Sequence, residues 1–317
     1  MMRETRGKKV SISVVVPALN EEENIPALTE RLERVLRDYS YENLFVDDGS
    51  GDGTLERIKQ RRRSNPLIHF ISLSRNFGHQ NALKAGMDYA SGACVITPDA
   101  DLQHPPEIIP AMIKKRRENF HVVFTIRDDN RSEAPLKRLA ARMSYALVNL
   151  ISEVRIQEET ADFRLLDRTV VDVLKKIDEP PFYRGMIPWM GFRQIGIHFD
   201  PHKRHAGASK YSIARMFGLA LSGLMSFSVL PLRLATFVGF LMAVSGFIVG
   251  TKAVFKYLLT HNTTPGWAST TASIVFVGGV QLIILGTIGE YLDRLFIESK
   301  KRPYYIVRES SKRGWRE

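Results

Sequence analysis

Two acidic residues one position apart, Asp99 and Asp101, are the residues of this sequence best placed to do chemistry. They follow a short apolar run, residues 93–96, whose pattern indicates a buried strand. Carboxylates at the carboxyl end of a strand lie where open α/β sheets bind their ligands. Two oxygen donors so close together suit a hard divalent cation such as Mg²⁺ or Mn²⁺, which would in turn hold phosphate groups. The pair therefore predicts a metal site that binds a phosphate-bearing ligand.

The elements that must position this pair follow from the hydrophobic pattern of the first half of the chain. Strand and helix signals alternate there with short connections, which predicts an α/β fold with a mostly parallel sheet covered by helices. Parallel strands bring their carboxyl ends to one edge, so polar clusters at 17–22, 47–54, 74–79 and 99–104 should meet there. The expected strands are 10–16, 44–46, 68–73, 93–97 and 122–126, and the expected helices are 24–36, 80–90, 106–118 and 134–155.

The charge of the chain points to an anionic partner. The formal net charge is +11 over 317 residues and the pI is about 9.7, which favours either a nucleic acid or an anionic membrane surface. The mean hydropathy of −0.14 averages two dissimilar halves, because residues 234–251 and 257–289 contain no Asp, Glu, Lys or Arg. Nucleic-acid binding would explain the charge but not these apolar segments. The single cysteine, Cys94, excludes an intrachain disulfide and is expected in the core.

The uncharged segments predict two transmembrane helices, because an apolar helix of roughly 20 residues spans a bilayer. The alternative is a buried helical hairpin in a soluble core. Basic residues precede the first segment and follow the second, so the positive-inside rule predicts that both ends are cytoplasmic. Residues 211–231 have the spacing of amphipathic interface helices, or of helices that pack only on the soluble domain. The expected organisation is a cytoplasmic domain at 1–210, interface helices at 211–231, transmembrane helices at 232–257 and 269–291, and a basic cytoplasmic tail at 298–317.

Three motifs give the chain a family resemblance. They are Val-Val-Pro-Ala-Leu-Asn-Glu-Glu at 15–22, Val-Asp-Asp-Gly-Ser at 46–50 and Asp-Ala-Asp-Leu-Gln at 99–103. With them the chain resembles the glycosyltransferases of family two, which have the GT-A fold. The segments 74–78, 162–167 and 204–212 and the two-span tail resemble the polyprenyl-phosphate glycosyltransferases, a group that contains bactoprenol glucosyltransferases and dolichyl-phosphate mannose synthases. Gly51 and Ala208 depart from the pattern, since relatives often have Thr and an acidic residue there.

This resemblance implies a Rossmann-like GT-A catalytic domain, a nucleotide-sugar donor, a polyprenyl phosphate acceptor and a homo-oligomer such as a tetramer. It implies that Asp99, Asp101 and Gln103 bind Mg²⁺ or Mn²⁺. It implies that Asp162 is the catalytic residue, either as a base or as a group that orients the acceptor. The residues implied in donor nucleotide binding are Pro17, Ala18, Glu22, Asp47 and Asp48, and those implied in acceptor or phosphate binding are Arg127, Arg138, Arg204 and Lys210.

Several of these positions also have plainer interpretations. Asp162 can cap a helix or pair with Arg164, and a phosphate acceptor, which is largely dianionic at pH 7, needs little deprotonation. Lys210 can be a solvated surface charge. His79 and His104 are interpreted as packing or hydrogen-bonding residues rather than metal ligands. The aromatic segment 182–189 is equally well explained by core packing and by a sugar or lipid path.

The expected function is inverting, metal-dependent transfer of a sugar to undecaprenyl or another polyprenyl phosphate at the cytoplasmic face of the inner or plasma membrane. Glucose from UDP-glucose is the first expectation, and mannose or an aminosugar is the alternative. A processive polysaccharide synthase would need more membrane spans and a Gln-x-x-Arg-Trp motif, which the sequence lacks. A membrane-bound nucleotide-sugar binding protein with a dead site is disfavoured by the intact Asp99, Asp101 and Asp162.

Overall fold

The computed structural model describes residues 11–127, 160–177, 181–199 and 266–312, together with scattered positions between 237 and 259. These residues belong to two compact units. The first unit contains the described residues up to 199 and residues 303–312. The second unit contains the described residues from 237 to 302.

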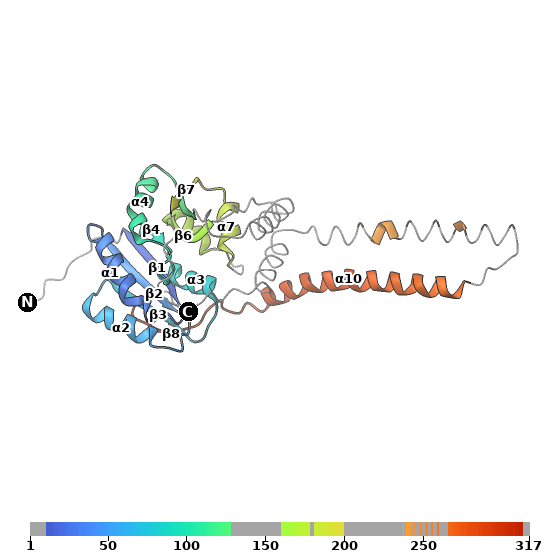
Figure 1. The fold of residues 1–317 in the computed structure, drawn as a ribbon, viewed down its shortest axis with the longest axis horizontal. Coiled ribbons are helices and arrows are strands. Elements are labelled where there is room, and N and C mark those ends of the chain that lie inside the picture. Colours follow the sequence, from blue (N-terminus) through green and yellow to red (C-terminus); the bar gives the residue numbers. More distant parts are fainter. Residues whose placement is uncertain are drawn as a thin grey trace, which may run out of the picture. The chain divides into compact units, whose positions relative to one another are not determined.

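A mixed sheet forms the centre of the first unit (Figure 1). In the described residues its strands are β1 (Ile12–Ala18), β2 (Tyr41–Asp47), β3 (Ile68–Leu73), β4 (Cys94–Ile96), β5 (Val122–Arg127), β6 (Thr160–Asp167), β7 (Gln194–Phe199) and β8 (Val307–Ser310). Their order is β7-β5-β6-β4-β1-β2-β3-β8. Strands β4, β1, β2 and β3 are parallel. β6 runs antiparallel between β4 and β5, β7 is parallel to β5, and β8 is antiparallel to β3.

Helices cover both faces of this sheet. The helices described in this unit are α1 (Asn24–Leu36), α2 (Thr54–Ser64), α3 (His79–Tyr89), the 3₁₀ helix η1 (Pro106–Ile108), α4 (Ile109–Arg117), α6 (Arg168–Leu174) and α7 (Tyr183–Trp189). Successive strand residues point to opposite faces. Val14 and Val16 share a core cluster with Leu28 of α1, whereas Val15 lies against Gly86 of α3, where a Cβ atom would have no room. α1 and α3 therefore lie on opposite faces, and every residue of β1 is buried between them (Figure 1).

The strands β1 to β4 form where the sequence predicts strands, although β2 begins three residues earlier than predicted and the helix α2 was not predicted. β1 continues through Pro17 to Ala18, although the prediction ended it before Pro17. β4 pairs with β1 only as far as Val14, so on that side there is no hydrogen-bond ladder for the proline to interrupt. Asn24 is the first residue of α1, at the start of the predicted helix 24–36, and donates from Nδ2 to Glu21 Oε2 at 2.6 Å.

The sheet is mixed, because β6 and β8 run against their neighbours, while the other described strands run in one direction, as predicted. Residues 162–167 of β6 were interpreted only as a family motif. Asp162, Arg164 and Asp167 interrupt their apolar pattern, so the segment lacks the continuous run typical of a central strand. The structure buries Arg164 all the same, with the side chain donating from Nη1 to Tyr183 O at 3.4 Å.

The last described residues return to the sheet of the first unit. The sequence interpretation treated 298–317 as a tail, but residues 307–310 form β8 along the outer edge of β3. Ser74 N donates to Ile306 O at 2.9 Å, and Ser311 N donates to Phe70 O at 3.0 Å. β8 thereby pairs backbone groups that an exposed edge strand would leave open.

The second unit contains one long described helix, α10 (Trp267–Ser299). Within the described residues it is the one helix that is long and apolar enough to cross a membrane. Its most apolar window, Phe276–Asp293, has a mean hydropathy of 1.2, and none of the residues in this window is buried. This window overlaps the predicted span 269–291. A Cβ atom at Gly239 would lie 3.5 Å from Ile284 Cδ1, so the preceding apolar segment contacts α10 at this point. The predicted helices at 134–155 and 211–231 and most of the predicted span 232–257 lie outside the described residues.

An ion pair with a buried carboxylate fixes the end of the C-terminal segment to β2. The Glu42 side chain is buried and accepts hydrogen bonds from Ser13 Oγ at 2.6 Å, from Ser91 N at 2.8 Å and from Lys312 Nζ. Burial by itself raises the pKa of the Glu42 carboxyl, but the hydrogen bonds from Lys312, Ser13 and Ser91 hold that pKa below its ordinary value of 4.5. Lys312 therefore neutralises a charge that the sheet would otherwise bury alone.

We expect Lys312→Ala to lower the free energy of unfolding by about 2–3 kcal/mol at neutral pH, because a buried carboxylate loses a charged donor. The pKa of Glu42 is lower in the folded than in the unfolded state, so its contribution is complete above pH 4.5 and is lost as the pH falls through the folded pKa. Urea unfolding of the wild type and of Lys312→Ala at neutral and at acidic pH measures the loss in the free energy of unfolding. This loss should be smaller at acidic pH. The matched control is Lys59→Ala, which breaks the more exposed pair with Glu309 and should cost less than about 1 kcal/mol. A loss that is equal at both pH values contradicts the assignment.

Candidate active site

The Asp-x-Asp pair lies on a tight loop after β4. Thr97 Oγ1 donates to the backbone oxygen of Asp162 at 2.8 Å, so the loop begins fastened to β6. Leu102 has a φ of 61°, in the left-handed region that a residue with a Cβ rarely adopts. Its side chain is buried in the core cluster, and Gln103 N donates to Asp101 Oδ1 at 3.1 Å. These contacts hold the turn in its strained conformation, which sets where the carboxylates point.

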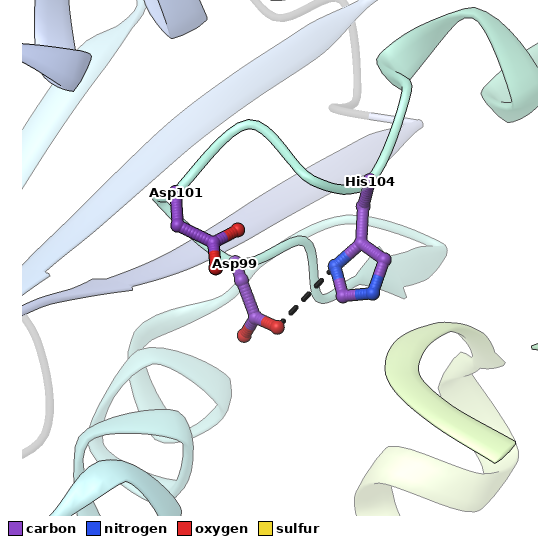
Figure 2. A group of neighbouring side chains, drawn as sticks. All are labelled: Asp99, Asp101 and His104. Atoms are coloured by element: carbon purple, nitrogen blue, oxygen red, sulfur yellow. Dashed lines mark ion pairs between the residues drawn. The ribbon is translucent and has the colours of Figure 1, made fainter. Parts of the chain in front are cut away.

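Asp99, Asp101 and His104 lie on the same side of this loop (Figure 2). One possible ligand atom from each of them lies within 4.8 Å of the other two, and His104 Nδ1 is 3.3 Å from Asp99 Oδ2. The His104 ring is 4% exposed and packs against Phe163 and Phe199, with ring centroids 5.4 and 5.7 Å away. Neither of its nitrogens makes a hydrogen bond of good geometry within the described residues. Two carboxylates beside an unsatisfied imidazole can hold a divalent cation.

Two histidines flank the Asp99 carboxylate. His79 Nε2, at the start of α3, is 3.5 Å from Asp99 Oδ1, while His104 faces the other oxygen. Burial by itself raises the pKa of Asp99, but the close contact with His104 and the electrostatic interactions with His79, His104 and Arg184 lower that pKa to about 2. Asp99 is therefore ionised at neutral pH, as a carboxylate ligand of a cation must be.

Asp162 lies near the start of β6, and both of its carboxylate oxygens accept from one guanidinium group. Arg184 of α7 donates from Nε to Oδ1 at 3.0 Å and from Nη2 to Oδ2 at 3.1 Å. The Arg184 side chain is 43% exposed, whereas that of Asp162 is 16% exposed. Burial lowers the pKa of the neighbouring Arg164 to about 10, with Asp162 acting to raise it. A half-exposed guanidinium held in a fixed plane is suited to bidentate binding of phosphate.

The loops after β1 and β2 are joined to each other by hydrogen bonds. Gly53 N donates to Glu22 Oε2 at 3.0 Å, and Asn20 N donates to Ser50 Oγ at 3.0 Å. A Cβ atom at Gly53 would lie 2.5 Å from the Glu22 carboxyl carbon, so a larger residue here would have to displace the Glu22 side chain. The two loops therefore form one continuous surface at the carboxyl edge of the parallel strands.

Two buried carboxylates connect these loops to the next strand, β3, and to the loop that follows it. Asp47 accepts from Ser72 Oγ of β3 at 2.9 Å. Asp48 accepts from Phe77 N at 2.7 Å and from Gly78 N at 2.9 Å, in the loop after β3. Burial raises the pKa of Asp48, in opposition to those two hydrogen bonds. Both aspartates are buried, so in this structure they order the loops instead of facing solvent.

Comparison with known proteins identifies the family to which this site belongs. The family model described as "Glycosyl transferase family 2" matches residues 13–175, a segment that contains Asp99, Asp101 and Asp162. The chain belongs to glycosyl transferase family 2. The resemblance predicted from its motifs is thereby confirmed, and with it the expectation of a hexosyltransferase.

Relatives of this glycosyltransferase match it over nearly its whole length. The uncharacterized glycosyltransferase YkcC of Bacillus subtilis strain 168 is 40% identical over 96% of this chain and 95% of that protein. The bactoprenol glucosyl transferase of Shigella phage SfV is 40% identical over 96% of this chain and 100% of that protein. Among solved structures, mannosyl-3-phosphoglycerate synthase from Rubrobacter xylanophilus matches with a TM-score of 0.51 and 16% identity, over 68% of this chain and 73% of that one. This last similarity concerns the fold, and it supports the predicted GT-A type of α/β sheet.

The other predicted site residues of the glycosyltransferase have diverse locations. Pro17 and Ala18 are buried at the end of β1, beside the joined loops. Arg127 is the last residue of β5. The predicted phosphate contacts Arg138, Arg204 and Lys210 lie outside the described residues.

Two residues at this site were not assigned to it from the sequence. His104 was interpreted as a packing or hydrogen-bonding residue rather than a metal ligand. It does pack, and it also adjoins Asp99. Arg184 belongs to the segment 182–189, whose role was left open between core packing and a ligand path. Tyr183 and Ile187 of that segment are buried, whereas Arg184 pairs with Asp162. An arginine within a short, otherwise apolar helix was the available signal, but its partner lies 22 residues away in sequence.

The two candidates for a third metal ligand can be separated by substitution. We expect His104→Phe to weaken Mn²⁺ binding by about 10–100-fold, because it keeps a ring between Phe163 and Phe199 but removes both nitrogens. The measurement is isothermal titration of the purified protein with Mn²⁺, with the melting temperature as a check on folding. Gln103→Ala is the paired variant. If Gln103→Ala weakens Mn²⁺ binding and His104→Phe does not, Gln103 is the ligand and the assignment of His104 is wrong.

Proposed function

We propose that this glycosyltransferase moves a sugar from a nucleoside diphosphate to a polyprenyl phosphate, with inversion at the anomeric carbon. The observation that carries the proposal is the 40% identity to the bactoprenol glucosyl transferase of Shigella phage SfV over 96% of this chain. This similarity takes in the apolar C-terminal third as well as the sheet. Glucose from UDP-glucose is the proposed donor, and mannose or an aminosugar is the alternative.

A divalent cation, Mg²⁺ or Mn²⁺, is proposed to bind Asp99 and Asp101, with Gln103 or His104 as a further ligand. When bound, the ion stabilises the charge that develops on the departing nucleoside diphosphate. Two carboxylates, kept ionised by their surroundings in the case of Asp99, support this role. The strained turn at Leu102 supports it as well, because strain of this kind concentrates at functional sites.

The donor nucleoside is proposed to lie against the joined loops after β1 and β2. These loops stand at the carboxyl edge of the parallel strands, next to the loop that carries Asp99, where open α/β sheets bind ligands. Asp47 and Asp48 contribute by fixing the loop backbone. The proposed donor-binding residues are Pro17, Ala18, Glu22, Asp47 and Asp48.

The acceptor phosphate is proposed to bind beside Asp162 and Arg184. A phosphate monoester has a second pKa of about 6, so most of the acceptor is dianionic at neutral pH and attacks without a general base. Asp162 accordingly orients Arg184, whose guanidinium can bind phosphate oxygens. A phosphate oxygen forms the new bond to the anomeric carbon while the bond to the nucleoside diphosphate breaks on the opposite face, which inverts that carbon. Arg127, Arg138, Arg204 and Lys210 are proposed to add phosphate contacts.

The enzyme is proposed to be an integral membrane protein with its catalytic unit at the cytoplasmic face, as a homo-oligomer such as a tetramer. The exposed apolar side chains along α10 support the proposal that this helix lies in the bilayer. Phe276, Leu282 and Leu285 are more than half exposed in the described chain. Apolar exposure on this scale marks a surface that contacts lipid or protein. If α10 lies in the bilayer, the enzyme and its proposed lipid acceptor are held in the same membrane.

A donor screen tests the proposed function. Purified protein with undecaprenyl phosphate and Mn²⁺ receives UDP-glucose, GDP-mannose or UDP-N-acetylglucosamine. The lipid product is identified by mass, and its anomeric configuration is read from NMR couplings. We expect one donor to give a glycosylated lipid phosphate with an inverted anomeric centre. Absence of lipid product with every donor, or a retained configuration, contradicts the proposal.

Substitution of the Asp-x-Asp pair tests the metal site. We expect Asp99→Asn and Asp101→Asn each to lower kcat by roughly 100–1,000-fold, because each removes a charged ligand from an ion that contributes several kcal/mol to the transition state. The control is Asp172→Asn, on the exposed face of α6, which should keep wild-type turnover. Turnover near that of the wild type in either pair variant contradicts the metal assignment.

A further inference from the structure

A chain of hydrogen bonds connects the proposed donor pocket to the C-terminal strand β8. Arg308 Nη2 donates to Ser72 Oγ of β3 at 2.9 Å, and Ser72 Oγ donates to Asp47 Oδ2 of β2 at 2.9 Å. The other Asp47 oxygen accepts from Ser50 N at 3.0 Å. Ser50 Oγ in turn accepts from Asn20 N, in the loop after β1. The chain therefore runs from β8 across two strands to both loops that form the pocket.

A β-bulge explains how Arg308 enters this chain. Ser72 of β3 pairs with Glu309, but the next residue, Leu73, pairs with Val307, so Arg308 is the extra residue on β8. A bulge of this kind re-aims a side chain next to a functional site. Glu309 is directed elsewhere and pairs with Lys59 Nζ of α2 at 2.8 Å. The two neighbours on β8 thus make separate contacts, of which only that of Arg308 leads to the pocket.

The inner members of the chain are shielded from water. Ser72 and Asp47 have no exposed surface. A serine hydroxyl has one proton, and because Arg308 donates to the Ser72 oxygen, that proton is left for Asp47. A buried carboxylate that loses a donor is strongly destabilised, so Asp47 keeps its hold on Ser50 best while the whole chain is intact.

We propose that Arg308 is a positioning residue for the nucleoside diphosphate donor, acting through Ser72 and Asp47 on the loops after β1 and β2. This inference rests on the proposed function, because that function assigns the donor pocket to these loops. Residues that follow α10 in the chain thereby support a proposed donor site whose other parts come from the first 80 residues. The C-terminal strand is then part of the donor site and not only an edge cover.

Binding and kinetics of five variants of the whole chain test this role. UDP, GDP and TDP are each titrated with Mn²⁺ into the protein in detergent micelles. For the nucleotide that the wild type binds, we expect Arg308→Ala to raise Kd about fivefold and the donor KM similarly, because an exposed arginine contributes a modest, screened interaction. Its kcat should stay within about twofold, since Arg308 touches no reacting atom. Arg308→Lys should recover part of the loss, and Glu309→Gln, on the same strand, should bind like the wild type.

Ser72→Ala identifies the route of the effect. If Arg308 acts through Ser72, the Arg308→Ala/Ser72→Ala double variant should bind no more weakly than the weaker single variant. Full additivity, or unchanged nucleotide binding in Arg308→Ala, overturns the inference while the proposed function stands. Equal losses in Glu309→Gln and Arg308→Ala also overturn it, because the effect is then one of strand stability. A wild type that binds none of the three nucleotides overturns the proposed function and the inference together.

Discussion

A charged carboxylate that is removed from water must be surrounded by donors or cations, and this requirement organises the edge of the sheet where the strands end. Asp47 and Asp48 are buried and take their donors from other loops: Ser72 beside Asp47, and Phe77 and Gly78 beside Asp48. Each buried charge thereby fixes a connection between two strand ends. The surface on which a ligand is proposed to bind is ordered by carboxylates that do not themselves face it.

The same requirement has another outcome at Asp99, which lies between two histidines. His79, His104 and Arg184 come from three different segments and keep the carboxylate ionised. Arg184 also takes both oxygens of Asp162, so the two acidic positions of the site share one electrostatic environment. A divalent cation and two phosphate-bearing ligands would bring both positive and negative charge to this site. The carboxylates can balance the positive charge, and Arg184 can balance the negative charge.

Much of the centre of the fold was predictable because its signals are local. Continuous apolar runs specified β1 to β4, and the glycine in Asp-Asp-Gly-Ser is required locally: Gly49 has a φ of 71°, and a Cβ there would lie 2.5 Å from the Arg75 carbonyl carbon. The strands β6 and β8 were not predicted, because charged residues interrupt the apolar pattern of each. Such strands form because a neighbouring strand offers unpaired backbone groups, which is information from another part of the chain.

The sequence by itself determined the chemistry: the Asp-x-Asp pair, the polar clusters after four parallel strands, the apolar C-terminal third and the family. These follow from residue type and from spacing over a few positions, where physical preferences are strong. Only the tertiary structure decided the partners: His104 beside Asp99, Arg184 on Asp162, and Arg308 on Ser72, the last pair 236 residues apart. The physical reason is that electrostatic contacts depend on distance in space and not on separation in sequence. The distances between these side chains are set by the order of the strands and by a bulge in β8 that no local pattern encodes.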